Sequence, residues 1–422
     1  MVKIYPFAAL RPASGLAPAI AAVPYDVVTA EEARSIIRQE PDSFLRVSRS
    51  DAELPDVPPH DNRVYQRARE NFLSLIKSGR MFQDPSPAMY VYRVRQDGST
   101  FTGLCCCIGI DDYRNNRIRC HEQTRYVKEE DRTRHIETIR AHNGPVVLLY
   151  RDTGTISSFL ESVISAGQNP SAEVTMPHGA IHQIFVLTDS QAIAHLETLF
   201  DGVPALYIAD GHHRAKAAVN VADRTTMNGL PSGSEVQRFM VAMFAHDRVR
   251  IHGYSRLLTD LGDYTQETFL HQLRKWFTVE QFYGKVDGSG YNIRPHRADH
   301  EKFHIMHMYL GGLWYECTRP VDQAATLPEA LDVSVLQKYV LEGMLGIRDP
   351  RSDARLQYLG GARPVADLEK LVDDGNYKVA FAMQPIRVRT VLAIADAGGV
   401  MPPKSTWFEP KLLSGLLVHT FS

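Results

Sequence analysis

The stretch Tyr207-Ile-Ala-Asp-Gly-His-His-Arg-Ala-Lys-Ala-Ala218 decides the fold of this chain, because it predicts a strand, a sharp turn and a helix within a few residues. Residues 205–209 are apolar and predict a short buried strand. Gly211 lets the backbone turn, and residues 214–222 predict an alanine-rich helix. A helix N-terminus attracts anions through its backbone N–H groups and its dipole. The stretch therefore predicts a phosphate-binding corner.

Two interpretations of this corner remain open from the residues alone. Arg214, in the first turn of the predicted helix, can add a charged guanidinium to an anion site. Asp210 then fits as a metal ligand, as the partner of a histidine or as a helix cap. In the alternative interpretation Asp-Gly is an ordinary turn and the two histidines are solvated.

Composition and charge exclude several classes of protein. The 422 residues suffice for two or three domains, and 47 Lys and Arg against 49 Asp and Glu give a net charge of −2. Without a basic surplus or a helix-turn-helix pattern, nucleic-acid binding is not expected. No apolar run approaches the roughly 20 residues that span a bilayer, and the N-terminus lacks a signal core. We expect a cytoplasmic protein that does not bind a membrane.

The alternation of apolar patterns predicts a mixed α/β (α+β) protein in three parts. Residues 1–114 form an N-terminal α/β segment with a hairpin around Asp97-Gly98, and residues 115–222 alternate between strands and helices as a central domain. A Gly-, Ser- and Thr-rich loop follows at 224–235. Residues 236–422 form a C-terminal α/β domain.

A second polar group, Cys120-His-Glu-Gln-Thr124, lies where a strand is predicted to end and a charged helix over 122–141 to begin. Glu122 is either a structural carboxylate at a helix start or a functional one, acting as a general base or as an acid that directs a metal. Ligands of α/β domains gather at the carboxyl ends of strands, and both polar groups lie at such ends. The two groups are therefore expected to face one cleft.

Two further segments combine polar residues with turn signals. The C-terminal Met401-Pro-Pro-Lys-Ser-Thr-Trp-Phe-Glu-Pro-Lys411 is either a rigid loop that presents ammonium groups to an anion or a packed terminal strap. Asp26, in Pro24-Tyr-Asp-Val27, either lines a site or caps a turn.

Taken in this order, Pro24-Tyr-Asp-Val27, His121-Glu-x-Thr124, the Asp-Gly-His-His-Arg corner and the C-terminal strap resemble the long form of domain-of-unknown-function family 1015. The resemblance runs from Tyr5 to about Val418. The central domain also resembles the ParB/sulfiredoxin superfamily, and within it the free serine kinases. One departure is Ala215, where the long form often has an aromatic residue.

The resemblance implies a small-molecule kinase that phosphorylates free L-serine to O-phospho-L-serine, with pyrophosphate, ADP or ATP as donor. Glu122 would be the base, and Asp210 and His213 would also be catalytic. Mg²⁺ would be held by Asp210, and no organic cofactor is expected. The other implied site residues bind phosphate (Gly211, His212, Arg214, Lys404, Ser405, Thr406 and Lys411) or substrate (His121, Thr124 and Asp26). The alternatives are a nucleotide-binding regulatory protein without turnover and a phosphohydrolase.

Overall fold

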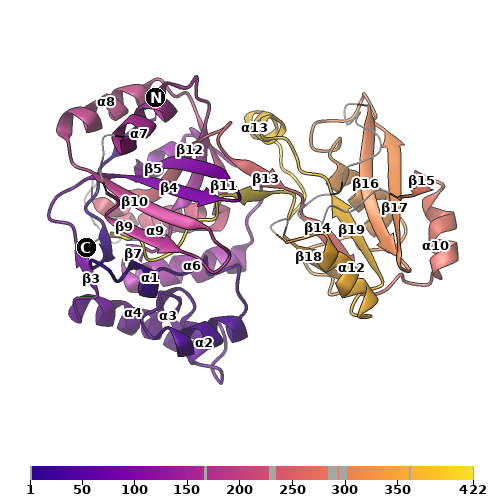
Figure 1. Ribbon diagram of the computed structural model, residues 1–422, viewed down its shortest axis with the longest axis horizontal. Helices are drawn as coiled ribbons and strands as arrows, with labels where there is room; N and C mark the ends of the chain where they lie inside the picture. Colours follow the sequence, from indigo (N-terminus) through magenta and orange to yellow (C-terminus); the bar gives the residue numbers. More distant parts are fainter. Residues whose placement is uncertain are drawn as a thin grey trace. The chain divides into compact units, whose positions relative to one another are not determined.

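The computed structural model describes residues 2–165, 169–227, 234–283, 293, 302–360 and 363–421 (Figure 1). Contacts divide the chain into two compact units. The first consists of residues 1–120, 124–249 and 410–422, and the second of residues 121–123 and 250–409. Both units combine helices with sheets, so the predicted mixed α/β class is confirmed. The likeness of the central part to ParB and sulfiredoxin stays a prediction.

A nine-stranded sheet forms the centre of the first unit. Its strands in spatial order are β6 (Ile118–Arg119), β11 (Leu206–Asp210), β8 (Val146–Tyr150), β12 (Arg238–Ala245), β5 (Ser99–Gly109), β4 (Met89–Gln96), β10 (Ile181–Leu187) and β9 (Ala172–Thr175), with β1 (Ile4–Tyr5) on β5. The pairs β11–β6 and β12–β8 are parallel and the others antiparallel. The sheet takes strands from all three expected segments, so the two units divide the chain at other positions than those segments do.

Helices cover the first unit, and two short strand pairs complete it. The helices are α1 (Ala17–Ile20), α2 (Ala30–Gln39), α3 (Leu45–Ser48), η1 (Ser50–Glu53), α4 (Asn62–Lys77), α5 (Ile110–Arg114), α6 (Tyr126–Ile139), α7 (Thr155–Ser165), α8 (Ser190–Asp201), α9 (His212–Met227) and η2 (Glu235–Gln237). The strand pairs are β2 (Leu10–Pro12) with β3 (Met81–Gln83), and β7 (Ala141–His142) with β21 (His419–Thr420). Within this unit α7 and α8 lie at one end, and α2, α3 and α4 at the opposite end (Figure 1).

Local sequence explains several of these elements. Thr29 caps α2, since its side chain accepts from the backbone of Glu32 while the Glu32 carboxylate accepts from Thr29. The predicted hairpin joins β4 to β5 through Asp97 and Gly98, both with positive φ. Of the predicted loop at 224–235, residues up to Met227 extend α9, and residues 228–233 lie outside the described ranges.

Small side chains position α9 over the sheet. Ala215, Ala218 and Ala222 are almost completely buried, in a core cluster that also contains residues of β8 and β12. Because alanine has a short side chain and a high helix propensity, it lets the helix backbone approach the strands closely without weakening the helix. This packing places the start of α9 at the carboxyl end of β11.

The second unit is built on a six-stranded antiparallel sheet. Its strands in spatial order are β15 (Thr278–Gln281), β17 (Leu313–Pro320), β16 (Phe303–Leu310), β19 (Val379–Met383), β14 (Ser255–Leu258) and β18 (Leu356–Leu359). The other elements are β13 (Arg250–His252) paired with β20 (Trp407–Glu409), α10 (Gln266–Leu273), α11 (Asp332–Leu336), the π-helical turn η3 (Gln337–Glu342), α12 (Ala366–Asp373) and α13 (Val388–Asp396). No helix within the described ranges has the length and hydropathy needed to cross a membrane.

We predict that Gly103→Ala destabilises the first unit. A Cβ atom on Gly103, in the middle of β5, would lie 2.7 Å from the ring of Phe244 and 2.8 Å from the backbone oxygen of Met243. Overpacking of this kind costs about 1–3 kcal/mol, which urea unfolding monitored by circular dichroism would measure. Gly109→Ala in the same strand is the control, because its Cβ would meet nothing closer than 3.8 Å. Equal losses of stability in the two variants would contradict the prediction.

Candidate functional site

The Asp-Gly turn predicted from the sequence joins β11 to α9. Gly211 has φ +93°, a conformation that side chains with a Cβ rarely adopt. A Cβ there would also lie 3.0 Å from Nε of Arg214. The register of β11 against β8 shifts between Ile208 and Asp210, an irregularity of the kind that turns a side chain away from the sheet. The α9 helix begins at His212, two residues before its predicted start.

Two cations hold the carboxylate of Asp210. Arg214 Nη2 lies 2.6 Å from Asp210 Oδ2, and Lys411 Nζ lies 2.6 Å from Oδ1. The three side chains are only 13 to 24% exposed, so solvent screens these charges weakly. The structure thus brings together the predicted residues Asp210, Gly211, Arg214 and Lys411.

The cluster of Asp210, Arg214 and Lys411 carries a net charge of +1 when all three side chains are ionised. Burial by itself would raise the pKa of Asp210, but the charges of Lys411 and Arg214 outweigh burial and hold that pKa well below its usual range. With Asp210 ionised, two cations share one carboxylate. The N-terminus of α9 adds its partial positive charge. The surplus favours an anion at this corner.

A small cavity beside Arg214 is lined by hydrogen-bond donors. Its polar lining includes Tyr25, Arg132, Asn143 and Arg214. The guanidinium of Arg132 lies 4.3 Å from the centre of the Tyr25 ring. Burial and the charge of Asp26 raise the pKa of Tyr25 to about 12, so its hydroxyl stays protonated at neutral pH. Within the described part of the chain, no group hydrogen-bonds to the buried Nδ2 of Asn143. With a volume of about 20 Å³, the cavity has room for a single water molecule.

His213 faces the start of α6. Its Nε2 accepts a hydrogen bond from the backbone N–H of Arg125 at 3.1 Å, which leaves the proton of the neutral ring on Nδ1. Burial, and then the charge of Lys128, lower the pKa of His213 to about 4, and Asp26 opposes this shift. His212 is buried. His213 and Asp26 therefore lie in one electrostatic neighbourhood, and His213 is neutral at pH 7.

The predicted helix start at Glu122 is wrong. The α6 helix begins at Tyr126, and residues 121–123 belong to the second unit. The carbonyl oxygen of His121 accepts from the N–H of Met401 at 2.9 Å, which draws this segment out of the helix. Burial lowers the pKa of His121 to about 4. Thr124 belongs to the first unit, and its hydroxyl bonds to the carboxylate of Glu129 in the first turn of α6.

The C-terminal strap is shared between the two units. Lys404, Ser405 and Thr406 belong to the second unit and Lys411 to the first. Ser405 is buried and its hydroxyl donates to the carbonyl of Pro402 at 2.6 Å. Lys404 is exposed and its ammonium lies 5.3 Å from the centre of the Tyr254 ring. Lys411, one of the phosphate-binding residues predicted in this strap, contacts Asp210 within the first unit.

The Mg²⁺ ion expected at Asp210 stays a prediction. Among the described residues, no group of three or more His, Cys, Asp and Glu side chains is placed to hold a metal ion. Asp210 offers one carboxylate, whose oxygens now pair with Lys411 and Arg214. Mg²⁺ usually takes one or two carboxylates and completes its shell with waters and substrate phosphates. Because both oxygens of Asp210 are paired with cations, an ion at this corner would have to arrive with a phosphate ligand.

The sequence did not predict all the residues that line the cavity beside Arg214. The sequence does not mark Tyr25 or Asn143 as site residues, and it offers Arg132 only as a candidate for the cleft on an otherwise solvated helix face. These residues come from segments far apart in the chain, and no spacing connects them. Only the position of Tyr25 beside Asp26, in a motif of the resembled family, offered a signal.

We predict that His213 titrates near pH 4 rather than near the unperturbed value of 6.5. The folded-state pKa lies below the unfolded one, so the stability that depends on neutral His213 is present above pH 6.5 and is lost as the pH falls towards 4. NMR titration of the imidazole ¹³C resonances would measure the midpoint, and His213→Gln would assign the resonance. A midpoint near 6.5 would contradict this description.

Comparison with known proteins places the chain in a family. No curated protein sequence is significantly similar to it. Similar solved structures include a free serine kinase in complex with AMP, with 13% identity and a TM-score of 0.36 over 75% of this chain and 90% of that chain. SbnI from Staphylococcus aureus, with a C-terminal truncation, has 11% identity and a TM-score of 0.37 over 74% and 85% of the two chains. A conserved hypothetical protein from Pyrococcus furiosus has 14% identity and a TM-score of 0.33 over 72% of this chain and 89% of that chain. The match to one family covers residues 4–334 and confirms the family expected from the motifs: the chain belongs to the family described as "Protein of unknown function (DUF1015)".

Proposed function

We propose that this protein is a small-molecule phosphotransferase that phosphorylates free L-serine, with pyrophosphate or an adenine nucleotide as donor. The observation that carries the proposal is the corner in which Lys411 and Arg214 hold Asp210 at the start of α9. Phosphoryl transfer depends mainly on positioning and on neutralising charge, and this corner has the groups to supply both. L-serine as the acceptor comes from the resemblance of the motifs to free serine kinases.

In this proposal the corner binds the donor phosphates. Lys411 and Arg214 would exchange part of their pairing with Asp210 for phosphate oxygens, and the first N–H groups of α9 would add hydrogen bonds. Asp210 would then be released to hold Mg²⁺, which supplies further charge neutralisation when it is bound. His213, neutral at pH 7, would orient groups by hydrogen bonding rather than act as a cation.

Glu122 would act as the base, a role that comes from the resemblance of the His-Glu motif to that of free serine kinases. The serine oxygen attacks the terminal phosphorus of the donor, the bond from phosphorus to the leaving phosphate breaks, and the hydroxyl proton passes to the Glu122 carboxylate. The products are O-phosphoserine and either phosphate or the shortened nucleotide. A phosphohydrolase would use the same donor site with water in place of serine, and a regulatory protein would bind nucleotide without turnover.

We predict that Lys411→Met lowers kcat/KM for O-phosphoserine formation by about a hundredfold. The reason is that the variant lacks one of the cations that neutralise the charge of the transferred phosphoryl group. The assay incubates the protein with L-serine, Mg²⁺ and, separately, pyrophosphate, ADP and ATP, and follows O-phosphoserine by ³¹P NMR. Lys77→Met is the matched control, since Lys77 is an exposed residue at the end of α4. Its activity should equal that of the unmodified protein.

Three results of the same assay would contradict the proposed kinase activity. Absence of O-phosphoserine with all three donors would exclude the kinase. Donor consumption that is independent of serine would favour the phosphohydrolase. Binding of a nucleotide that raises the melting temperature without turnover would favour the regulatory protein.

Glu122→Gln should lower kcat by at least about a hundredfold, because a positioned base typically contributes between a hundredfold and ten-thousandfold. The amide has nearly the same shape but cannot accept the proton at neutral pH. Donor affinity, measured by the thermal shift with each donor, should stay unchanged. A Glu122→Gln protein with full activity would remove Glu122 from the mechanism.

A further inference from the structure

A second cleft in the first unit lies outside the donor corner. It has a volume of about 290 Å³ and is bordered by the loop after Pro24, the segment from α3 to η1, and the starts of α4 and α6. Such a volume is at the small end of the range for ligand pockets, roughly 300–1,000 Å³, and suits a small molecule. Tyr25, Arg132 and His135 line both this cleft and the cavity beside Arg214. The two spaces therefore adjoin.

One polar group in this cleft has no partner within the described part of the chain. Ser48, the last residue of α3, is 3% exposed, and no described group hydrogen-bonds to its buried hydroxyl. A buried polar group that lacks a partner costs about 1–3 kcal/mol. Ser50, two residues further on, lines the same cleft but donates to the carbonyl of Val64 at 2.7 Å. The unsatisfied hydroxyl of Ser48 points to a ligand that is polar.

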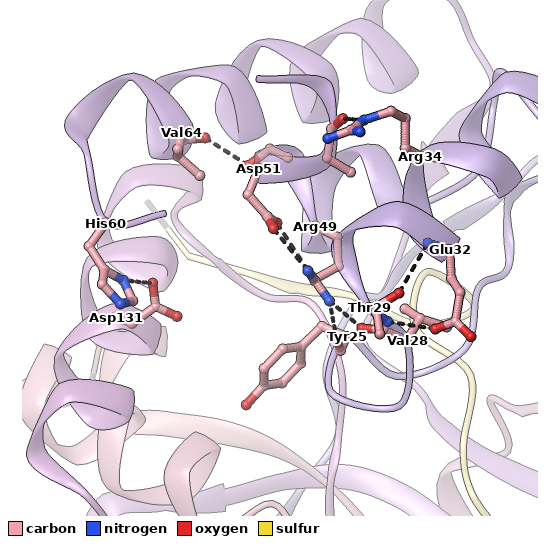
Figure 2. Close-up of polar contacts among 12 residues, drawn as sticks. Tyr25, Val28, Thr29, Glu32, Arg34, Arg49, Asp51, His60, Val64 and Asp131 are labelled. Carbon is pink, nitrogen blue, oxygen red and sulfur yellow. Dashed lines mark hydrogen bonds and ion pairs between the residues drawn. The ribbon is translucent and has the colours of Figure 1, made fainter. Parts of the chain in front are cut away.

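The walls around Ser48 are held in place. Arg49 makes two hydrogen bonds to the carboxylate of Asp51, at 3.0 and 2.9 Å, and donates to the carbonyls of Tyr25 and Val28. On the other side Asp131 accepts from Tyr65 and from His60. Figure 2 shows the Arg49–Asp51 pair above Tyr25 and the His60–Asp131 pair to its left. The cleft is thus preformed.

The floor of the cleft is fixed in the same way. Nε2 of His135 lies 2.9 Å from the carbonyl oxygen of Val47, next to Ser48. His135, which lines both spaces, is therefore held beside Ser48.

Charges of both signs line the cleft. Lys128 and Arg132 carry positive charge, and Asp26 and Asp131 carry negative charge. Carboxylates would repel a purely anionic ligand such as a second phosphate chain, and the cations would repel a purely cationic one. A zwitterion with a carboxylate and an ammonium group matches both signs.

We propose that this cleft binds the free amino acid, with the hydroxyl of Ser48 as one of its hydrogen-bonding partners. The inference rests on the proposed phosphotransferase function. It places the acceptor beside the donor corner, with Arg132 on the border between the two. Arg49 acts as a positioning residue that holds the loop at Tyr25 through the carbonyls of Tyr25 and Val28.

The test compares Ser48→Ala with Ser50→Ala. Ser48→Ala should raise the KM for L-serine about tenfold, the loss of one good hydrogen bond, and leave the KM for the donor unchanged. Its melting temperature should stay equal or rise, because an unsatisfied buried hydroxyl is removed. Ser50→Ala should show the opposite pattern, a lower melting temperature with the KM for L-serine nearly unchanged.

Failure of this inference is separable from failure of the proposed function. If the unmodified protein makes O-phosphoserine but Ser48→Ala leaves the KM for L-serine unchanged, the acceptor site lies elsewhere and the phosphotransferase stands. A rise in the KM for the donor instead would assign the cleft to the donor. If the unmodified protein makes no O-phosphoserine with any donor, both the proposed function and the proposed amino-acid site are overturned.

Discussion

The ion pair between Asp210 and Lys411 links residues 201 positions apart within the first unit. A carboxylate that is only 23% exposed needs positive partners, and one of them comes from the end of the chain. The residues after Lys411 then pair along the N-terminal segment, with Ser414 bonded to Ala22, Val418 bonded to Leu10, and β21 on β7. The C-terminal segment thus holds the phosphate corner and the N-terminal segment together.

The same interaction prepares the corner for an anion. Two cations and one carboxylate leave a surplus positive charge, and the glycine turn and the start of α9 add oriented N–H groups. Asp210 keeps the two cations in place and limits their mutual repulsion until an anion arrives. In the proposed phosphotransferase these groups are already ordered, so little reorganisation would be needed when charge develops on the transferred phosphoryl group, as electrostatic catalysis requires.

The N-terminal segment adds a second layer to this site. Its Tyr25 loop is held by Arg49, and Tyr25 together with Arg132 lines both the cavity at Arg214 and the cleft with Ser48. Arg132 is in turn oriented by Asp131 through two hydrogen bonds. One continuous network of charged groups therefore borders both spaces, as expected where two small ligands must be placed next to each other.

Sequence alone determined the features that depend on near neighbours in the chain: the Asp-Gly turn before α9, the Thr29 capping box, the hairpin at Asp97-Gly98, the mixed α/β class and the family. It placed Asp210, Gly211, Arg214 and Lys411 among the site residues. The predicted start of α6 was wrong, because the helix begins at Tyr126. The N–H of Met401 donates to the carbonyl oxygen of His121, and no local sequence pattern encodes this hydrogen bond. Only the tertiary structure decided that Lys411 pairs with Asp210, that Tyr25, Arg132 and Asn143 share a cavity, and that the hydroxyl of Ser48 is buried in a cleft. Burial and charge pairing between distant segments depend on how the chain packs, whereas turns and caps depend on a few adjacent residues.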